Sequence, residues 1–226
     1  MNKTVGKQPK TMCIVAGGEI DASCLSVVRK MSIVIGVDGG ALWLVNHGVD
    51  PDVAIGDFDS VTAKEKRHVH DHAGRYIQYL PQKDETDLEL AIEEAIRLKP
   101  KSVVIYGALG RRFDHALSAV QMLTRLESHN IYGEIVDNFN KINIVRRLMT
   151  LTKDTAYPYI SIISLESTAC VTLVGFVYNV SRKQFLSDSS LGVSNQIVDK
   201  TAEIIVHQGK ILVVRSSDVR VGSRIS

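Results

Sequence analysis

Asp57 and Asp59, two carboxylates separated by one residue, are the side chains whose spacing most clearly suggests chemistry. They follow a short apolar run that ends in Gly56. In an extended segment, side chains at positions i and i+2 point to the same side, so both acids could face one ligand. Because two like charges side by side repel, a shared divalent cation such as Mg²⁺ would explain the pair. The alternative is an ordinary polar turn from Gly56 to Ser60, since Gly, Asp and Ser are common turn residues.

Further acids recur at the ends of predicted strands in the first part of the chain. Short apolar runs alternate with helical patterns from residue 11 to residue 145, which predicts a parallel α/β sheet. In open parallel sheets, ligands bind beyond the carboxyl ends of the strands. The acids expected at that edge are Asp38, Asp57, Asp59, Asp84, Asp87 and Asp114. So many acids at one edge favour a bound cation over a purely structural role.

Two of these acids also have a simple structural interpretation. Asp84 and Asp87 are three residues apart at the predicted start of a helix, a spacing typical of a capping pair. Asp114 could likewise cap the helix that follows it. Arg111 and Arg112 lie beside glycines in a strand-to-helix loop, where they could bind phosphate oxygens or form a solvated basic pair. The sequence contains no P-loop motif, so a nucleotide would be bound without one.

The composition is that of an ordinary globular protein. The chain has 226 residues, 45% hydrophobic and 23% charged, and a formal net charge of +2. Such a balance gives no sign of nucleic-acid binding or of attraction to an anionic membrane. The three cysteines are scattered, no apolar signal sequence follows the polar first ten residues, and no window is long and apolar enough for a membrane span. We therefore expect a cytoplasmic protein with reduced cysteines.

Three histidines near each other, His68, His70 and His72, suggest a zinc site at first sight. They lie in a charged segment with a helical pattern. Positions i, i+2 and i+4 do not share one face of a helix, so a solvated surface is the favoured interpretation.

The residue pattern of the sequence changes near residue 150, where short β-rich runs replace the helical patterns. These runs predict a small antiparallel β domain over residues 151–226, after an α/β domain over residues 1–150. The predicted strands cover residues 159–165, 170–180, 201–207 and 210–215. Gln208-Gly209 has the composition of a tight hairpin turn between the last two.

Two features of this β domain allow a plain structural interpretation. Residues 189–195 are polar and contain a glycine, as an ordinary loop would. Tyr178 lies in an apolar run and is expected in the core or half-buried.

Taken in order, the motifs resemble the thiamine pyrophosphokinase family. They are Asp38-Gly39-Gly40, Gly56-Asp57-Phe58-Asp59-Ser60, Lys83-Asp84-Glu85-Thr86-Asp87 and Gly110-Arg111-Arg112-Phe113-Asp114-His115, followed by Ser194-Asn195. Each motif alone is weak, but the ordered series is specific and covers the chain from about Cys13 to Val214.

The resemblance implies a fold and a reaction. The fold is an N-terminal parallel-sheet, three-layer α/β nucleotide-binding domain followed by a small antiparallel β-sandwich that binds thiamine. The reaction moves a pyrophosphoryl group from ATP to the hydroxyl of thiamine and gives thiamine diphosphate and AMP. The resemblance also implies Mg²⁺ as cofactor and a homodimer with active sites between the subunits.

Site residues follow from the resemblance by matching motifs. The Mg²⁺ and phosphate site would comprise Asp57, Asp59, Asp84 and Asp87. The nucleotide and phosphate contacts would come from Asp38, Gly39, Gly40, Arg111, Arg112 and Asp114. Thiamine would contact Tyr178, Ser194 and Asn195. Tyr178 stands where the family often has a tryptophan, and Gly-Arg-Arg replaces the usual Gly-Gly-Arg of the fourth motif.

Two other functions are compatible with the acidic motifs. A Mg²⁺-dependent phosphohydrolase would also use an Asp-x-Asp pair and would release phosphate without thiamine. A non-catalytic module would bind thiamine or a nucleotide and form no product.

Overall fold

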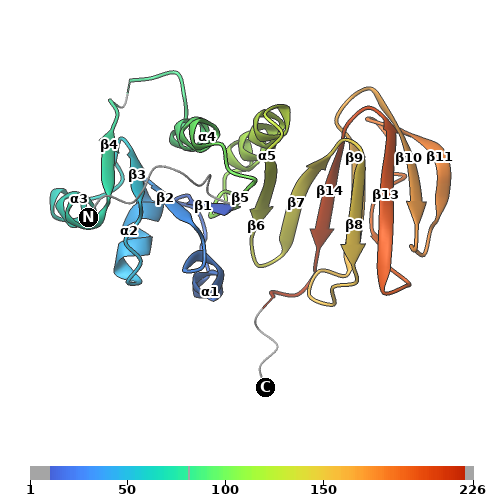
Figure 1. Ribbon diagram of the computed structural model, residues 1–226, viewed down its shortest axis with the longest axis horizontal. Coiled ribbons are helices and arrows are strands. Elements are labelled where there is room, and N and C mark those ends of the chain that lie inside the picture. The colour runs from blue at the N-terminus through green and yellow to red at the C-terminus, as the bar shows by residue number, and fades with distance from the viewer. Residues whose placement is uncertain (1–10, 81, 222–226) are drawn as a thin grey trace. The chain divides into compact units, whose positions relative to one another are not determined.

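The chain divides into two compact units between Asp137 and Asn138. The computed structural model describes residues 11–80 and 82–221, and Figure 1 shows its helices and strands. The first ten residues, for which the sequence predicts no signal sequence, lie outside the described part.

The N-terminal unit contains a parallel sheet, as the sequence predicts. Its strands are β1 (Thr11–Val15), β2 (Ile33–Val37), β3 (Val53–Gly56), β4 (Arg75–Gln78), β5 (Ser102–Tyr106) and β6 (Tyr132–Val136). Within this unit the strand order is β6-β5-β1-β2-β3-β4, and all neighbours are parallel. The chain moves outward from β1 to β4 and then returns to β5 on the other side of β1. The order therefore reverses beside β1, the place where open α/β sheets form a ligand-binding crevice.

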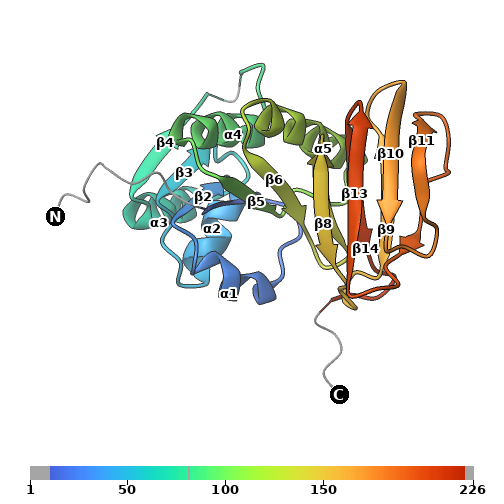
Figure 2. The ribbon, with the colours of Figure 1, turned by 45° about the vertical axis from the view of Figure 1, so that its right-hand side comes forward.

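Helices cover both faces of this sheet. They are α1 (Leu25–Val28), α2 (Gly39–Asn46), α3 (Ala63–His72), α4 (Asp87–Leu98) and α5 (Phe113–Ser128). α4 and α5 lie on one face, and α1 and α2 lie on the other (Figure 1, Figure 2). This is the expected three-layer arrangement, in which both faces of the buried strands β1, β2 and β3 are covered.

Ion pairs fix α4, the helix that carries Asp87. Glu94 accepts hydrogen bonds from Arg75 on β4 at 2.6 Å and from Arg97 one turn further along α4 at 2.6 and 2.9 Å. Its side chain is only 10% exposed. Arg125 of α5 reaches two further acids of α4, Glu89 at 2.5 Å and Glu93 at 3.0 Å. Charged groups thus tie α4 to β4 and to α5.

We expect Glu94→Gln to lower the free energy of unfolding by about 1 kcal/mol near neutral pH, because charge-assisted hydrogen bonds are lost. The hydrogen bond from Arg97 lowers the pKa of Glu94 from 4.5, helped by Arg75 and opposed by partial burial. A depressed pKa stabilises the fold above pH 4.5, and this contribution is lost as the pH falls through the lower pKa of the folded state. Urea unfolding at about pH 6 and about pH 3.5 should therefore show a smaller acid-induced loss in the variant. An identical loss in both proteins would contradict this role.

The C-terminal unit is a sandwich of two antiparallel sheets. Its strands are β7 (Asn140–Val145), β8 (Leu148–Thr152), β9 (Tyr159–Ser164), β10 (Thr168–Val174), β11 (Val180–Leu186), β12 (Asn195–Gln196), β13 (Thr201–Gln208) and β14 (Ile211–Ser216). One sheet has the order β12-β9-β14-β7, and the other has the order β11-β10-β13-β8. The second sheet is visible in Figure 2 as a row of neighbouring arrows. Buried side chains from both sheets form one core, including Ile162, Val171, Phe185, Ile204 and Val213.

Three sequence predictions for this half need correction. The first unit ends at Asp137 rather than near residue 150, because β7 and β8 pair with β14 and β13 of the second unit. The single strand predicted over residues 170–180 is two, since β10 ends at Val174 and β11 begins at Val180.

The third correction concerns the turn at Gln208-Gly209, where Gly209 has φ +80°. The strands that it joins, β13 and β14, do not form a hairpin. β13 pairs with β8 and β10, whereas β14 pairs with β7 and β9. Both strands bury alternate side chains in the same core, so the turn carries the chain from one sheet to the other.

Candidate active site

A cavity of about 540 Å³ opens at the carboxyl ends of the central strands of the N-terminal unit. Residues that follow β1, β2, β3 and β5 line it, together with the first residues of α4 and α5. It lies where the reversal of strand order predicts a ligand site. Five sequence-predicted site residues are part of its lining, namely Asp38, Asp57, Asp87, Arg111 and Arg112.

Three carboxylates gather beside this cavity. Oxygen atoms of Asp38, Asp57 and Asp59 lie within 4.8 Å of one another. The sequence predicts that Asp57 and Asp59 reach this arrangement in an extended segment, but the structure places them in a turn. β3 ends at Gly56, and Phe58 adopts a left-handed conformation with φ +56°. The Phe58 ring is fully buried and stacks on Tyr76 at 4.7 Å, so the turn sends the aromatic ring inward and leaves the two acids on the other side.

Hydrogen bonds satisfy only part of this cluster. The Asp59 main-chain N–H donates to Asp57 Oδ1 at 3.0 Å, and Ser60 Oγ donates to Asp38 Oδ2 at 2.6 Å. Asp38 Oδ1 is buried and has no hydrogen-bond partner within the part of the chain that the structure describes. The negative charge of Asp57 raises the pKa of Asp59, with smaller contributions from desolvation and from Asp38. An unpartnered buried oxygen and mutual repulsion are what a bound cation would relieve.

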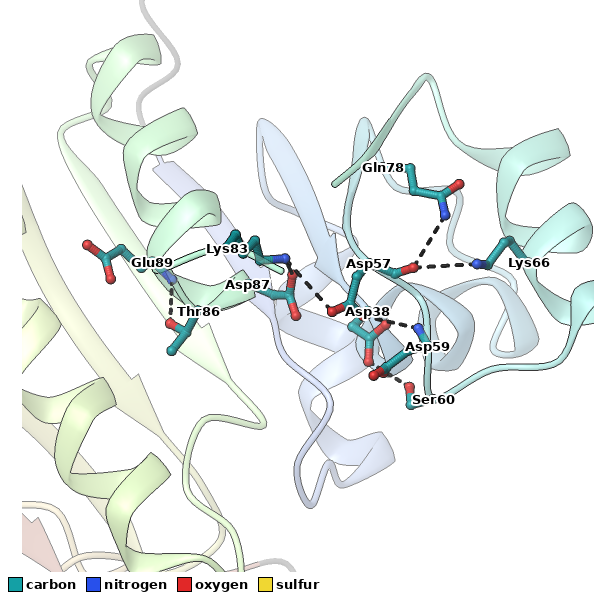
Figure 3. A network of polar contacts seen from close by, with 10 residues as sticks. All are labelled: Asp38, Asp57, Asp59, Ser60, Lys66, Gln78, Lys83, Thr86, Asp87 and Glu89. Carbon is teal, nitrogen blue, oxygen red and sulfur yellow. Dashed lines mark hydrogen bonds and ion pairs between the residues drawn. The ribbon is translucent and has the colours of Figure 1, made fainter. Parts of the chain in front are cut away.

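Lys83 links this cluster to the start of α4 (Figure 3). Its Nζ lies 2.5 Å from Asp87 Oδ1 and 4.0 Å from Asp57 Oδ2. Asp57 also has contacts through its main-chain oxygen, which accepts from Lys66 Nζ and Gln78 Nε2, each at 3.4 Å. Asp57 is therefore the residue on which the polar contacts converge.

Asp84 has a different position from the one predicted for it. It is exposed, and it belongs neither to the three-carboxylate cluster nor to the cavity lining. It does not cap α4 either, because the N-cap is Thr86, whose hydroxyl accepts from Glu89 N–H at 3.2 Å. Asp87 is the first residue of α4, where a negative charge favours the helix dipole.

Gly39 and Gly40, predicted to contact the nucleotide, lie next to Asp38 but are not part of the cavity lining. Gly39 and Gly40 begin α2, directly after Asp38, which has φ +47°. A Cβ atom on Gly40 would lie 2.2 Å from the main-chain oxygen of Val15, so only glycine allows this close approach of α2 to the end of β1.

The two arginines of the fourth motif differ in their contacts. Arg112 is the N-cap residue of α5 and forms a two-point contact with Asp114, at 2.5 and 3.2 Å. This contact lowers the pKa of Asp114. Arg111 is 94% exposed, and its Nε lies 3.8 Å from Glu19 Oε1. Both residues line the cavity, where a guanidinium group can bind an anion.

Sequence reasoning missed two residues of the site. Ser60 and Lys83 lie inside the recognised motifs, but the sequence predicts no role for either. Lys83 lies before α4, so its contact with Asp87 is not signalled by helical spacing.

The loop predicted to bind thiamine in the C-terminal unit is organised by Asn195. Its Oδ1 accepts the N–H of Tyr178 at 3.1 Å and of Gln196 at 2.9 Å, and its Nδ2 donates to the Tyr178 oxygen at 2.9 Å. Ser194 is exposed with φ +61°, and its N–H donates to Ser161 Oγ at 3.1 Å. Tyr178 is 69% exposed, so the expectation of a buried or half-buried ring was wrong.

His68, His70 and His72 are exposed on α3, which confirms the prediction of a solvated face. Among the described residues, none of the helices combines the length and apolar character that crossing a membrane would require.

Comparison with known proteins finds a matching family model for each of the two units. Residues 24–134 match the family model described as "Thiamin pyrophosphokinase, catalytic domain", and residues 148–211 match "Thiamin pyrophosphokinase, vitamin B1 binding domain". The chain is 32% identical over 213 residues to the thiamine pyrophosphokinase of Bacillus subtilis, covering 92% of this chain and all of the relative.

Solved structures show the same fold. The crystal structure of the Bacillus subtilis thiamine pyrophosphokinase superposes with a TM-score of 0.86 at 31% identity, covering 93% of this chain and all of the other. The yeast thiamin pyrophosphokinase has a TM-score of 0.75 at 14% identity, covering 94% of this chain and 88% of the other, which supports the fold alone.

Proposed function

The chain belongs to the thiamine pyrophosphokinase family, the ATP:thiamine diphosphotransferases, and we propose that the cavity of its N-terminal unit is the ATP site. The reaction of the family transfers a pyrophosphoryl group from ATP to thiamine and yields thiamine diphosphate and AMP. The observation that carries the proposal is the three-carboxylate cluster, with its unpartnered Asp38 oxygen, beside a cavity bordered by two arginines.

The donor set fits Mg²⁺. Carboxylate oxygens are its preferred protein ligands, and Asp38, Asp57 and Asp59 supply them from two strand ends. When bound, Mg²⁺ would neutralise charge on the transferred phosphates. Asp87 would support this set through Lys83. The role of Asp84 as a ligand stays a prediction from the resemblance.

The remaining residues would orient ATP. Main-chain N–H groups at the start of α2, from Gly39 and Gly40, suit phosphate oxygens because the amino end of a helix carries partial positive charge. Arg111 and Arg112 would add two charged donors, with Asp114 holding the Arg112 guanidinium in place. Such positioning supplies much of the rate of phosphoryl-type transfers.

For thiamine, we propose Tyr178, Ser194 and Asn195 as binding residues. The exposed Tyr178 ring can stack on a cationic aromatic ligand. Asn195 would act by holding the Tyr178 main chain, because its side-chain amide is already engaged there.

We expect Tyr178→Ala to raise the KM for thiamine about tenfold, in line with the strength of a cation–π contact. The KM for ATP should stay unchanged, because the ring lies in the other unit. Tyr178→Trp, with a larger ring, should lower the KM for thiamine. Steady-state kinetics with each substrate varied in turn measures this, and an equal KM for thiamine in all three proteins would refute the contact.

The reaction itself is tested by incubating the purified protein with thiamine, ATP and Mg²⁺. Chromatography should show AMP and thiamine diphosphate in equal amounts. Phosphate release without thiamine would instead indicate a phosphohydrolase. Binding of both ligands without any product would indicate a non-catalytic module.

Two predictions of the resemblance and composition remain to be tested. The homodimer, with active sites between subunits, requires a mass measurement in solution, for example by light scattering after gel filtration. The cytoplasmic location requires fractionation of cells that produce the protein.

A further inference from the structure

Lys83 has an unusual environment for a lysine. Its side chain is 13% exposed, and its ammonium group lies between two carboxylates that come from different elements. Asp57 follows β3, and Asp87 begins α4. Because Lys83 precedes α4, its contact with Asp87 is not an ordinary pair along a helix surface. The ammonium also lies 5.4 Å from the centre of the Tyr79 ring.

The two oxygens of the Asp57 carboxylate face different partners (Figure 3). Oδ1 accepts the Asp59 N–H on the side of the three-carboxylate cluster. Oδ2 is the atom nearest to Lys83, at 4.0 Å. The carboxylates of this site therefore offer two positions for a cation. One lies among Asp38, Asp57 and Asp59, where the unpartnered Asp38 oxygen is found, and the other lies between Asp57 and Asp87.

We propose that Lys83 is a positioning residue that permanently fills the second of these positions, so that the protein alone binds one divalent cation rather than two. The inference rests on the proposed function of the same site. Four acids close together would otherwise attract a second ion, because like charges in a partly buried cleft repel. The ammonium group supplies one positive charge at this position, where its hydrogen bond to Asp87 keeps it 4.0 Å from Asp57 Oδ2.

Counting bound Mn²⁺ in the absence of nucleotide tests this, because Mn²⁺ accepts the same oxygen ligands as Mg²⁺. Free Mn²⁺ is measured by electron paramagnetic resonance during titration of the protein. We expect one bound ion per chain in the wild type and two in Lys83→Met. Lys83→Arg keeps the charge and should bind one. Lys66→Met is the matched control, because Lys66 contacts only the main-chain oxygen of Asp57, and it should also bind one.

The outcomes separate this inference from the proposed function. If the wild type forms AMP and binds one Mn²⁺, and Lys83→Met binds the same number with the same affinity, the role of Lys83 is refuted while the function stands. A wild type that binds no Mn²⁺ and forms no AMP would refute both. Thermal unfolding shows whether the Lys83→Met variant is folded. If it is unfolded, Lys83→Gln is used in its place, and this variant should also bind two Mn²⁺ ions.

Discussion

Replacing Asp57 by Asn should reduce kcat/KM for thiamine diphosphate formation by about 100-fold or more, the loss typical of removing one electrostatic contact from a transition state. Asp57 is the member of the cluster with the most contacts, since its carboxylate lies near those of Asp38 and Asp59, near the Asp59 N–H and near Lys83. An amide in its place keeps the shape but removes the charge that a divalent cation requires. Measuring AMP formation at saturating and limiting Mg²⁺ separates weakened cation binding from a slower chemical step.

The fold should tolerate this change. Because the charge of Asp57 raises the pKa of Asp59, its removal relieves repulsion and offsets the lost contact with Lys83. We expect the Tm to stay within about 3 °C of the wild type. Asp71→Asn is the matched control, because Asp71 is 62% exposed on α3 and should keep full activity. Near-wild-type rates in Asp57→Asn would refute the site.

Asp84→Asn distinguishes the four-residue metal set predicted from the sequence from the cluster seen in the structure. If Asp84 is a ligand, its replacement should cost as much activity as that of Asp57. If the cluster of Asp38, Asp57 and Asp59 is sufficient, the exposed Asp84 should be replaceable with a much smaller loss.

Gly40→Ala should destabilise the N-terminal unit by about 3 kcal/mol, which is the upper end of the usual cost of overpacking. The new methyl group would lie 2.2 Å from the Val15 oxygen and 2.7 Å from the Ala16 oxygen, and both are main-chain atoms that cannot rotate away. Relief requires α2 to move from the end of β1, which displaces Asp38 as well. We therefore expect a fall in Tm of roughly 8 °C together with a loss of activity.

Gly39→Ala is the matched control for this prediction. Its new Cβ would meet nothing closer than 3.8 Å, an ordinary contact distance, and Ala favours the helix more than Gly. Calorimetry should therefore show unchanged or slightly higher stability. Equal losses in the Gly39 and Gly40 variants would show that the contact with β1 is not the cause.

The order of the elements in the N-terminal unit could be predicted from the sequence because its central strands are buried on both faces. Runs such as Ile33–Val37 and Val53–Gly56 are apolar without interruption, and helical patterns separate them. Acids directly after such runs fall at one edge of the sheet, so Asp38 and Asp57 could be assigned to a common site. The C-terminal unit was harder to predict, because most of its strand pairs join segments that are distant in sequence. Nothing local shows that β13 and β14 belong to different sheets.

The sequence by itself determined the family, the fold class and the edge of the sheet at which the acids gather, because these depend on residue order and on periodic burial. The tertiary structure decided which acids actually meet. Parallel pairing of β2 with β3 brings Asp38 to Asp57, and the left-handed turn at Phe58 brings Asp59 to both. It also placed Lys83 between two carboxylates and left Tyr178 exposed. Such contacts depend on the backbone path of segments distant in sequence, and no local pattern of residue types specifies that path.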